Sequence, residues 1–525
     1  MLLLNLPKIE ENAEPAFADS MSCARWISQF QLTDIRLAHG TLAKKLWEVN
    51  RSRIPPLDRL KITEQLRDTV SIVQDGYARK IIGKPLPFDE IESRVLDEIL
   101  SLWEAMTASY GHCLKACMEG DPGVSRHLAL ICQRCLRYTG LQIAEYLLMQ
   151  HQCEPSLWLQ LHQLYLFSEE KGFSSFPILE SLKLYPRPTS CADHFVRTVL
   201  ICQASPYELS RKQFQVVNRW LDEWVSWVDI SGTLPATSRD TPPLEVDLES
   251  QDCVRPGTSE GRSIRYLDTS ELGKNLRIKI ALLQQGQKPS QIGLGDEFRT
   301  EFCIALIEKL HRYWCEGKVP RMFEKRSIRD ETEICFGLES LHERLSGQTF
   351  AQPGEEGRLN HKQHEEIRLF GHVATRDGKK DSNETEKWDI QDENAKGFVL
   401  IRSGPGRRVG PGHLVGIQSG EDFLPCVIRW AIEGLDGSIN MGLRLIEGRP
   451  EAVAIRATGI SASGKYVQAV LLNSGEWSSL IMPKGWYVQG RIIEAVDADR
   501  LTMQLRLADL AGKGADYERA IFIQL

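Results

Sequence analysis

The first part of the chain carries apolar residues at helical spacing. Ile62, Leu66, Val70 and Val73 are separated by four, four and three positions, so they fall on one face of an α-helix. Similar stripes recur, and segments rich in turn formers, such as EGDPG, CEP and ASPYE, separate them. The pattern predicts an all-α domain over residues 1–230 with helical-repeat-like packing. Further helices are expected over about 90–118, 125–150, 155–171, 192–203 and 210–228.

The helical pattern stops at Ser231. Residues 231–261 are rich in Pro, Ser, Thr and acidic residues without periodicity, which is typical of a linker. Residues 262–320 carry two more helical stripes and are expected to form a helical connector. Within them, Asp268, Ser270 and Gly273 spell DxSxxG just before a helical stripe, so we interpret this segment as a helix N-cap.

After Pro320 short strand-like runs alternate with glycine-rich turns, as in GFVLIR, HLVGIQ, LPCVIRW and LTMQLRL. In the last run, Leu501, Met503, Leu505 and Leu507 alternate with polar residues, as in a strand with one buried face. Many short strands with polar turns predict an antiparallel β-barrel over 321–460. Residues 461–525 are expected to be a β extension or a second small barrel. The fold class is therefore a multi-domain chain with an α part followed by a β part.

The segment from Trp388 to Gly448 resembles a PilZ domain. The family has a DxSxxG motif just before a strand, followed later by a V-x-W-x run and a strand that begins with glycine. Here DENAKG over 392–397 is followed by FVLI, then by VIRW and MGLRLI. Asn394 stands where the family usually has serine.

The resemblance implies a β-barrel that binds the bacterial second messenger cyclic di-GMP. In the family, an RxxxR motif before the barrel clamps guanine and phosphate, because the planar fork of arginine matches both groups. The counterpart here is RMFEKRSIR, with lysine at the first position. The resemblance thus implies a ligand site made of the following residues: Lys325, Arg326, Arg329, Asp392, Asn394 and Gly397.

Two other stretches suggest chemistry at first sight. The loop GPGRRVGPG over 404–412 is flanked by strands and lacks the helix of a phosphate-binding loop, so we expect a hairpin turn. Cys113, Cys117, Cys132 and Cys135 have zinc-like spacing but lie in helical pattern, so we interpret them as buried structural thiols. Zinc bound in stoichiometric amount would restore the alternative of a metalloprotein. We expect no metal, no cofactor and no enzyme.

Composition narrows the function further. The 525 residues have a formal net charge of −7 and no apolar run long enough to span a bilayer, so we expect a cytoplasmic protein without DNA or RNA as partners. Its 13 cysteines fit a reducing compartment. The sequence predicts a bacterial effector that couples cyclic di-GMP sensing to protein contacts of the helical domain. The alternative is a PilZ-like adapter that binds no nucleotide and acts only through an unknown protein partner.

Overall fold

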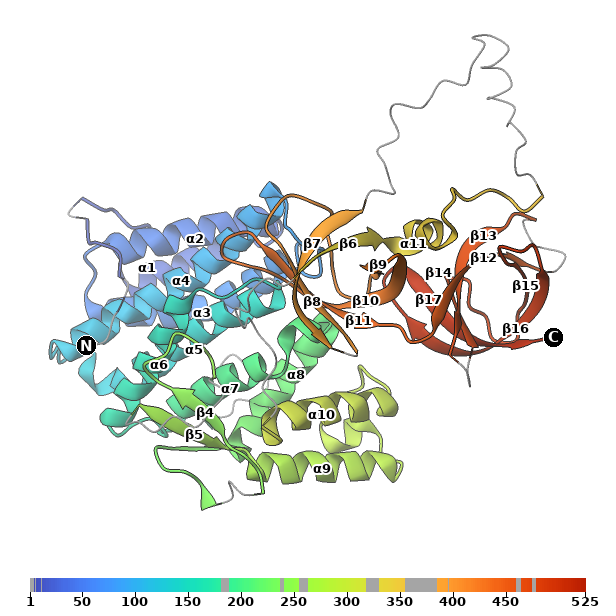
Figure 1. Ribbon diagram of the computed structural model, residues 1–525. Helices are drawn as coiled ribbons and strands as arrows, with labels where there is room; N and C mark the ends of the chain where they lie inside the picture. Colours follow the sequence, from blue (N-terminus) through green and yellow to red (C-terminus); the bar gives the residue numbers. More distant parts are fainter. Residues whose placement is uncertain are drawn as a thin grey trace, which may run out of the picture. The chain divides into compact units, whose positions relative to one another are not determined.

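A computed structural model of the chain was analysed (Figure 1). It describes residues 4, 6–10, 12–180, 188–236, 240–254, 263–317, 330–354, 385–394, 396–458, 464–474 and 478–525. The chain divides into two compact units. The helical unit comprises Met1–Lys84 and Phe88–Phe323, and the barrel unit comprises Pro85–Pro87 and Glu324–Leu525. The predicted order of an α part and then a β part is confirmed.

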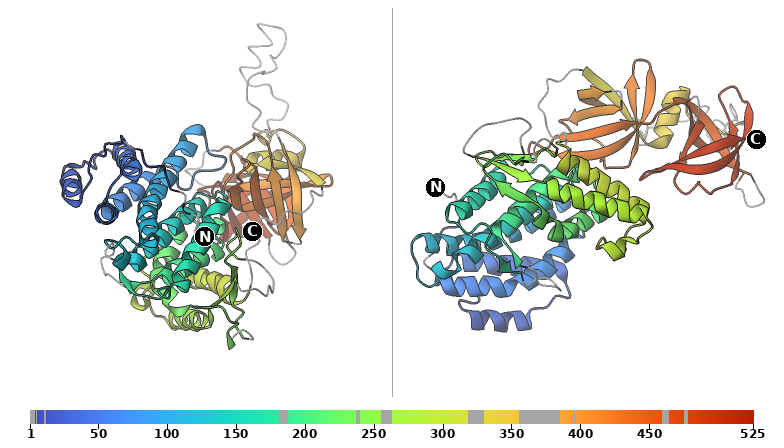
Figure 2. Two further views of the ribbon diagram at one scale, coloured as in Figure 1. Left: turned by 90° about the vertical axis from the view of Figure 1, so that its left-hand side faces the viewer. Right: turned by 90° about the horizontal axis from the view of Figure 1, so that it is seen from below.

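Long helices make up most of the helical unit (Figures 1 and 2). They are α1 (Ser20–Gln29), α2 (Ile35–Arg51), α3 (Pro56–Ala78), α4 (Glu90–Met118), α5 (Leu128–Leu148), α6 (Pro155–Glu170), α7 (Cys191–Gln203), α8 (Arg211–Trp224), α9 (Ser270–Gln284) and α10 (Thr300–Cys315). The apolar stripe that predicted α3 is buried as expected, since Ile62, Leu66, Val70 and Val73 are all inaccessible to solvent.

Helix ends follow from local chemistry. Asp89 caps α4 because its Oδ1 accepts from the N–H groups of Ile91 (2.9 Å) and Glu92 (2.8 Å), which the helix itself leaves unpaired. The predicted cap at the start of α9 is also confirmed in position, and Asp268 provides it by accepting from Ser270 N–H at 2.9 Å. The hydroxyl of Thr269 points elsewhere and donates to the Trp314 carbonyl of α10 at 2.8 Å.

Short strands lie in the helical unit as well. β3 (Asp229–Ser231), β5 (Ile264–Asp268) and β4 (Leu244–Asp247) form an antiparallel sheet in that order, and β1 (Ile178–Leu179) pairs with β2 (Pro188–Thr189). The strand β4 lies within the region expected to be a linker. Leu244 and Val246 are buried there on one face of the strand. This alternation covers only four residues, so it does not stand out among the surrounding Pro and Thr residues.

The first barrel of the barrel unit is antiparallel and closed in the order β10-β11-β8-β7-β6-β9. Its strands are β6 (Asp330–Phe336), β7 (Glu386–Asn394), β8 (Gly397–Arg402), β9 (Leu414–Ser419), β10 (Asp422–Glu433) and β11 (Ile439–Leu445). Helix α11 (Gly337–Ser346) follows β6 directly and contacts strands of both barrels (Figure 1).

A second closed barrel follows in the order β12-β13-β14-β17-β16-β15. Its strands are β12 (Arg449–Ala457), β13 (Val467–Asn473), β14 (Ser478–Pro483), β15 (Ile492–Val496), β16 (Thr502–Lys513) and β17 (Tyr517–Gln524). Leu505 and Leu507 are fully buried as the alternation predicted, whereas Leu501 lies before β16 and is exposed. Strand β12 falls within 321–460, yet it pairs with β13 and β15 of the second barrel.

One apolar cluster joins the two barrels. Cys335 of β6 and Leu341 of α11 belong to the same buried cluster as Val470 and Ile481 of the second barrel. Burial of apolar surface on this scale stabilises the contact between barrels. The domain boundaries expected from sequence stay predictions. None of the helices in the described part of the chain is long and apolar enough to cross a membrane.

Candidate functional site

The β7–β8 hairpin carries the residues of the DENAKG motif. Asp392 pairs with Val399 across the hairpin, and Asn394 pairs through its backbone with Gly397 next to the turn. The register shifts between Ile390 and Asp392, which marks a bulge directly before the motif. The hairpin therefore brings Asp392, Asn394 and Gly397 to one end of the first barrel, which we call the hairpin end.

Gly397 is required at its position by the barrel itself. A Cβ on this residue would lie 1.9 Å from the carbonyl oxygen of Leu443 on the neighbouring strand β11. Real Cβ atoms do not approach a carbonyl so closely, so any side chain at residue 397 would push β8 away from β11. The glycine is thus explained by a close strand contact, without a ligand.

The basic residues Lys325, Arg326 and Arg329 lie outside the described residues. The described chain resumes at Asp330, which pairs with Ile390 of β7. Ile390 lies two positions before Asp392 in the sequence. The chain that follows the basic segment therefore enters the barrel on the strand next to the motif, at the hairpin end.

The opposite end of the first barrel holds a buried ion pair. Arg402, at the end of β8, donates to Glu386 Oε2 at 2.5 Å, and its guanidinium lies 4.7 Å from the centre of the Trp388 ring. Arg402 also donates to the Arg407 carbonyl at 3.2 Å from both Nη1 and Nη2, and Arg407 N–H donates to Glu386. A Cβ on Gly406 would lie 2.4 Å from Arg402 Nη1, so this loop needs glycine to pass over the pair.

The prediction of a hairpin turn for GPGRRVGPG is wrong. The loop joins β8 to β9, and these strands are not neighbours in the barrel. It therefore crosses an end of the barrel, and strand propensity on both sides did not reveal which partners the strands would choose.

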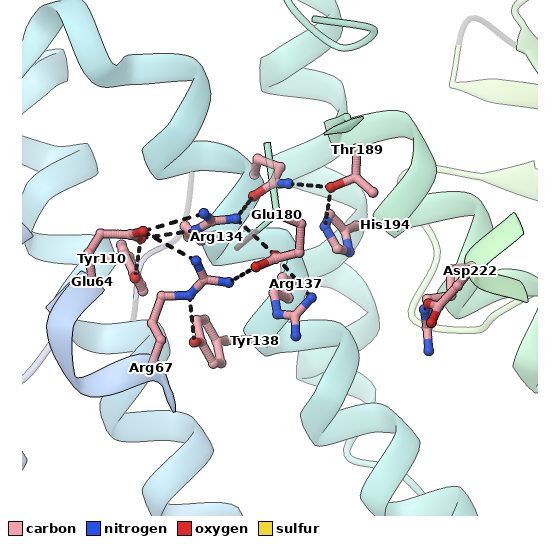
Figure 3. Close-up of polar contacts among 12 residues, drawn as sticks. Glu64, Arg67, Tyr110, Arg134, Arg137, Tyr138, Glu180, Thr189, His194 and Asp222 are labelled. Carbon is pink, nitrogen blue, oxygen red and sulfur yellow. Dashed lines mark hydrogen bonds and ion pairs between the residues drawn. The ribbon is translucent and has the colours of Figure 1, made fainter. Parts of the chain in front are cut away.

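The helical unit contains a buried network of charged residues that the sequence did not reveal (Figure 3). Glu180 accepts from Arg134 Nη1 and Arg137 Nη1, each at 3.1 Å, and also from Arg67. Arg134 reaches back to Glu64, whose Oε1 lies 2.9 Å from Arg134 Nε. The side chains of Arg67, Arg134 and Glu180 are almost inaccessible to solvent.

These contacts determine the charge of Glu180. Burial alone would raise the pKa of this carboxyl group, but the charges of Arg137, Arg134 and Arg67 outweigh burial and lower the pKa to about 2. Glu180 is therefore ionised at neutral pH. The network ties Glu180, the residue directly after β1, to Arg134 of α5 and Arg67 of α3, which lie 46 and 113 positions earlier in the sequence.

The cysteines of the zinc-like pattern lie in α4 and α5. Burial raises the pKa of Cys113 to about 12 and that of Cys117 to about 11. Zinc ligands must be thiolates, so these environments oppose the ionisation that binding needs. Among the described residues, no group of three or more His, Cys, Asp or Glu side chains is arranged to hold a metal ion.

Part of the helical unit matches a known family model. Residues 21–236 match the family model described as "Cyclic-di-GMP receptor FimW, N-terminal domain". The Cyclic-di-GMP receptor FimW of Pseudomonas aeruginosa is 20% identical over 328 residues, covering 61% of this chain. The chain matches about half the length, 52%, of that relative. The sequence of the helical half carries no short motif that points to this family.

Two solved structures also match parts of this chain, both with low TM-scores. One is K. pneumonia MrkH in its apo state, with 8% identity, a TM-score of 0.12 and coverage of 27% of this chain and 75% of MrkH. The other is MrkH described as a c-di-GMP dependence transcription regulatory factor, with 11% identity and a TM-score of 0.14. That match covers 40% of this chain and 90% of MrkH. The expectation that DNA is not a partner is contradicted by this description of a transcription regulator, and it is withdrawn.

Proposed function

We propose that this chain is a bacterial cytoplasmic effector that binds cyclic di-GMP at the hairpin end of the first barrel and passes the signal to the helical unit. The PilZ-like motif and the match of residues 21–236 to a receptor domain support this proposal from separate parts of the chain. The second of these observations carries the proposal, because it does not depend on the barrel motif.

The proposed ligand contacts follow from chemistry. Asp392 accepts from the N–H groups of a guanine edge, and Arg326 and Arg329 donate to phosphate or to guanine O6 and N7. Lys325 contributes a charge without the bidentate geometry of arginine. Asn394 offers an amide to a phosphate, while Gly397 keeps the hairpin close to β11.

The test is a calorimetric titration of the full chain with cyclic di-GMP, with GTP as the competitor. Asp392→Ala and Arg329→Ala are each expected to weaken binding about tenfold or more, because a hydrogen bond to a charged group contributes about 1.5–3 kcal/mol. Asp509→Ala, an exposed carboxylate on β16 of the second barrel, is the matched control and should bind like the wild type.

Two outcomes would contradict the proposal. If the folded protein binds no cyclic di-GMP at high micromolar concentration, the barrel is an adapter without a nucleotide. If binding occurs but both variants bind like the control, the ligand site lies elsewhere in the chain.

A further inference from the structure

A second site is built where the two barrels meet. A cavity of about 610 Å³ lies within the barrel unit, and the residues that line it come from both barrels and from the first turn of α11. This volume falls in the range of small-molecule sites, about 300–1,000 Å³. Phe336, at the end of β6, is part of the wall, whereas the first residue of β6 pairs beside the DENAKG motif. The cavity is therefore at the other end of the first barrel from the hairpin end.

Aromatic rings form much of the cavity wall. Phe336, Phe350, Tyr466 and Trp486 line it from different segments, and each is only half buried. A base stacks favourably on the face of an aromatic side chain, whatever its sequence identity. A cavity with several partly accessible rings is thus suited to a flat heteroaromatic group.

Charged groups of both signs lie among these rings. Arg407 lines the cavity, and its backbone is fixed because its N–H donates to Glu386 and its carbonyl accepts from Arg402. Glu339 and Asp516 bring carboxylates to the same wall. Guanine presents acceptors at O6 and N7 and donors at its N–H groups, so a guanidinium and a carboxylate together match it better than they match adenine.

One buried hydroxyl lies in the wall. Ser340 is 3% exposed, and among the described residues its Oγ finds no oxygen or nitrogen partner and has only the Cys335 thiol as a polar neighbour. Residues 337–340 are the first turn of α11, and the N-cap residue Phe336 supplies no side-chain acceptor for the first N–H groups. A buried hydroxyl without a strong hydrogen-bond partner is costly, and a polar ligand in the cavity would supply that partner.

We propose that this cavity binds a guanine nucleotide at a site separate from the hairpin end. The base stacks on the aromatic rings, Arg407 donates to O6 and N7, and a carboxylate accepts from the N–H groups of the base. Because the walls come from both barrels, an occupied cavity favours the arrangement in which the barrels meet. The proposal does not depend on cyclic di-GMP binding at the hairpin end.

The experiment titrates the full chain with GMP and, separately, with AMP, using ligand-observed NMR and calorimetry. The chain carries Asp392→Ala throughout, so that binding at the hairpin end is weakened equally in every titration. GMP is expected to bind more tightly than AMP. Arg407→Ala is expected to weaken GMP binding at least about fivefold, as a good bidentate contact contributes about 1–3 kcal/mol.

Two further variants make the result specific. Arg407→Lys keeps the charge but loses the fork, so it is expected to weaken GMP binding as well. Arg408→Ala is the matched control, since this neighbouring arginine is exposed and does not line the cavity. The proposal is overturned if GMP at millimolar concentration does not bind, if AMP binds equally well, or if both Arg407 variants bind like Arg408→Ala. Failure of cyclic di-GMP binding in the parent chain would leave this outcome unaffected.

Discussion

At the scale of single residues, the charge of Glu180 makes the clearest prediction. Its pKa is about 2 in the folded chain, below the usual value of 4.5, so the ionised form stabilises the fold at neutral pH. Glu180→Gln removes a buried partner of three arginines and is expected to lower the free energy of unfolding by about 3–5 kcal/mol at pH 7. Urea unfolding followed by circular dichroism measures this loss.

The pH dependence of this variant carries a definite sign. Because folding lowers the pKa, the contribution of Glu180 is complete above about pH 4.5 and is lost as the pH falls toward about 2. The difference in stability between wild type and Glu180→Gln should therefore shrink below pH 4.5. Lys115→Gln, which removes an exposed charge on α4, is the control and should show little effect at either pH. A difference that stays constant across this range would contradict the network.

At the scale of elements, Gly397 tests how tightly β8 lies against β11. Gly397→Ala would place a methyl group 1.9 Å from the Leu443 carbonyl oxygen, so the strands must separate. Overpacking of this kind costs about 1–3 kcal/mol, and the thermal unfolding of the barrel unit should shift downward accordingly. Gly404→Ala, with no atom within 4 Å of its Cβ position, is the matched control for differential scanning calorimetry. Equal unfolding temperatures for the two variants would refute the close contact.

The elements also show which parts of the fold could be predicted from the sequence. The helical pattern and the turn signals predicted a helix over about 90–118, and α4 spans Glu90–Met118, because both signals are local. The loop over 404–412 was misjudged because strand partners are chosen by the whole barrel. Glu64 and Glu180 could not be joined to their arginines, since nothing in the sequence relates positions so far apart.

For the candidate sites, too, local features could be predicted from the sequence and long-range ones could not. The ligand site that the PilZ resemblance implies at Asp392, Asn394 and Gly397 stays a prediction, although the β7–β8 hairpin places all three residues near one turn because a hairpin is a local structure. The cavity between the barrels was not predicted, because Phe336, Arg407 and Trp486 converge only when both barrels have closed.

At the scale of the whole molecule, the proposed effector must pass a signal between units that form separate compact bodies. Ligand bound at one hundred times its dissociation constant stabilises the folded state of the unit that holds it by about 2.7 kcal/mol. Amide hydrogen exchange in the barrel unit should then slow by up to about a hundredfold where exchange requires global opening. A ligand that acts only on the barrel leaves exchange in α1 to α10 unchanged.

The proposed function therefore predicts that cyclic di-GMP alters exchange in peptides of the helical unit as well as in the β7–β8 hairpin. Mass spectrometry of the full chain with and without ligand separates the two responses, and Asp392→Ala should weaken both. Slower exchange confined to the barrel unit would support binding but contradict coupling. Coupling requires that ligand binding at the barrel also change the stability of the helical unit. The helical unit, which contains the residues 21–236 that match the family model, is thus where the functional consequence of binding must be measured.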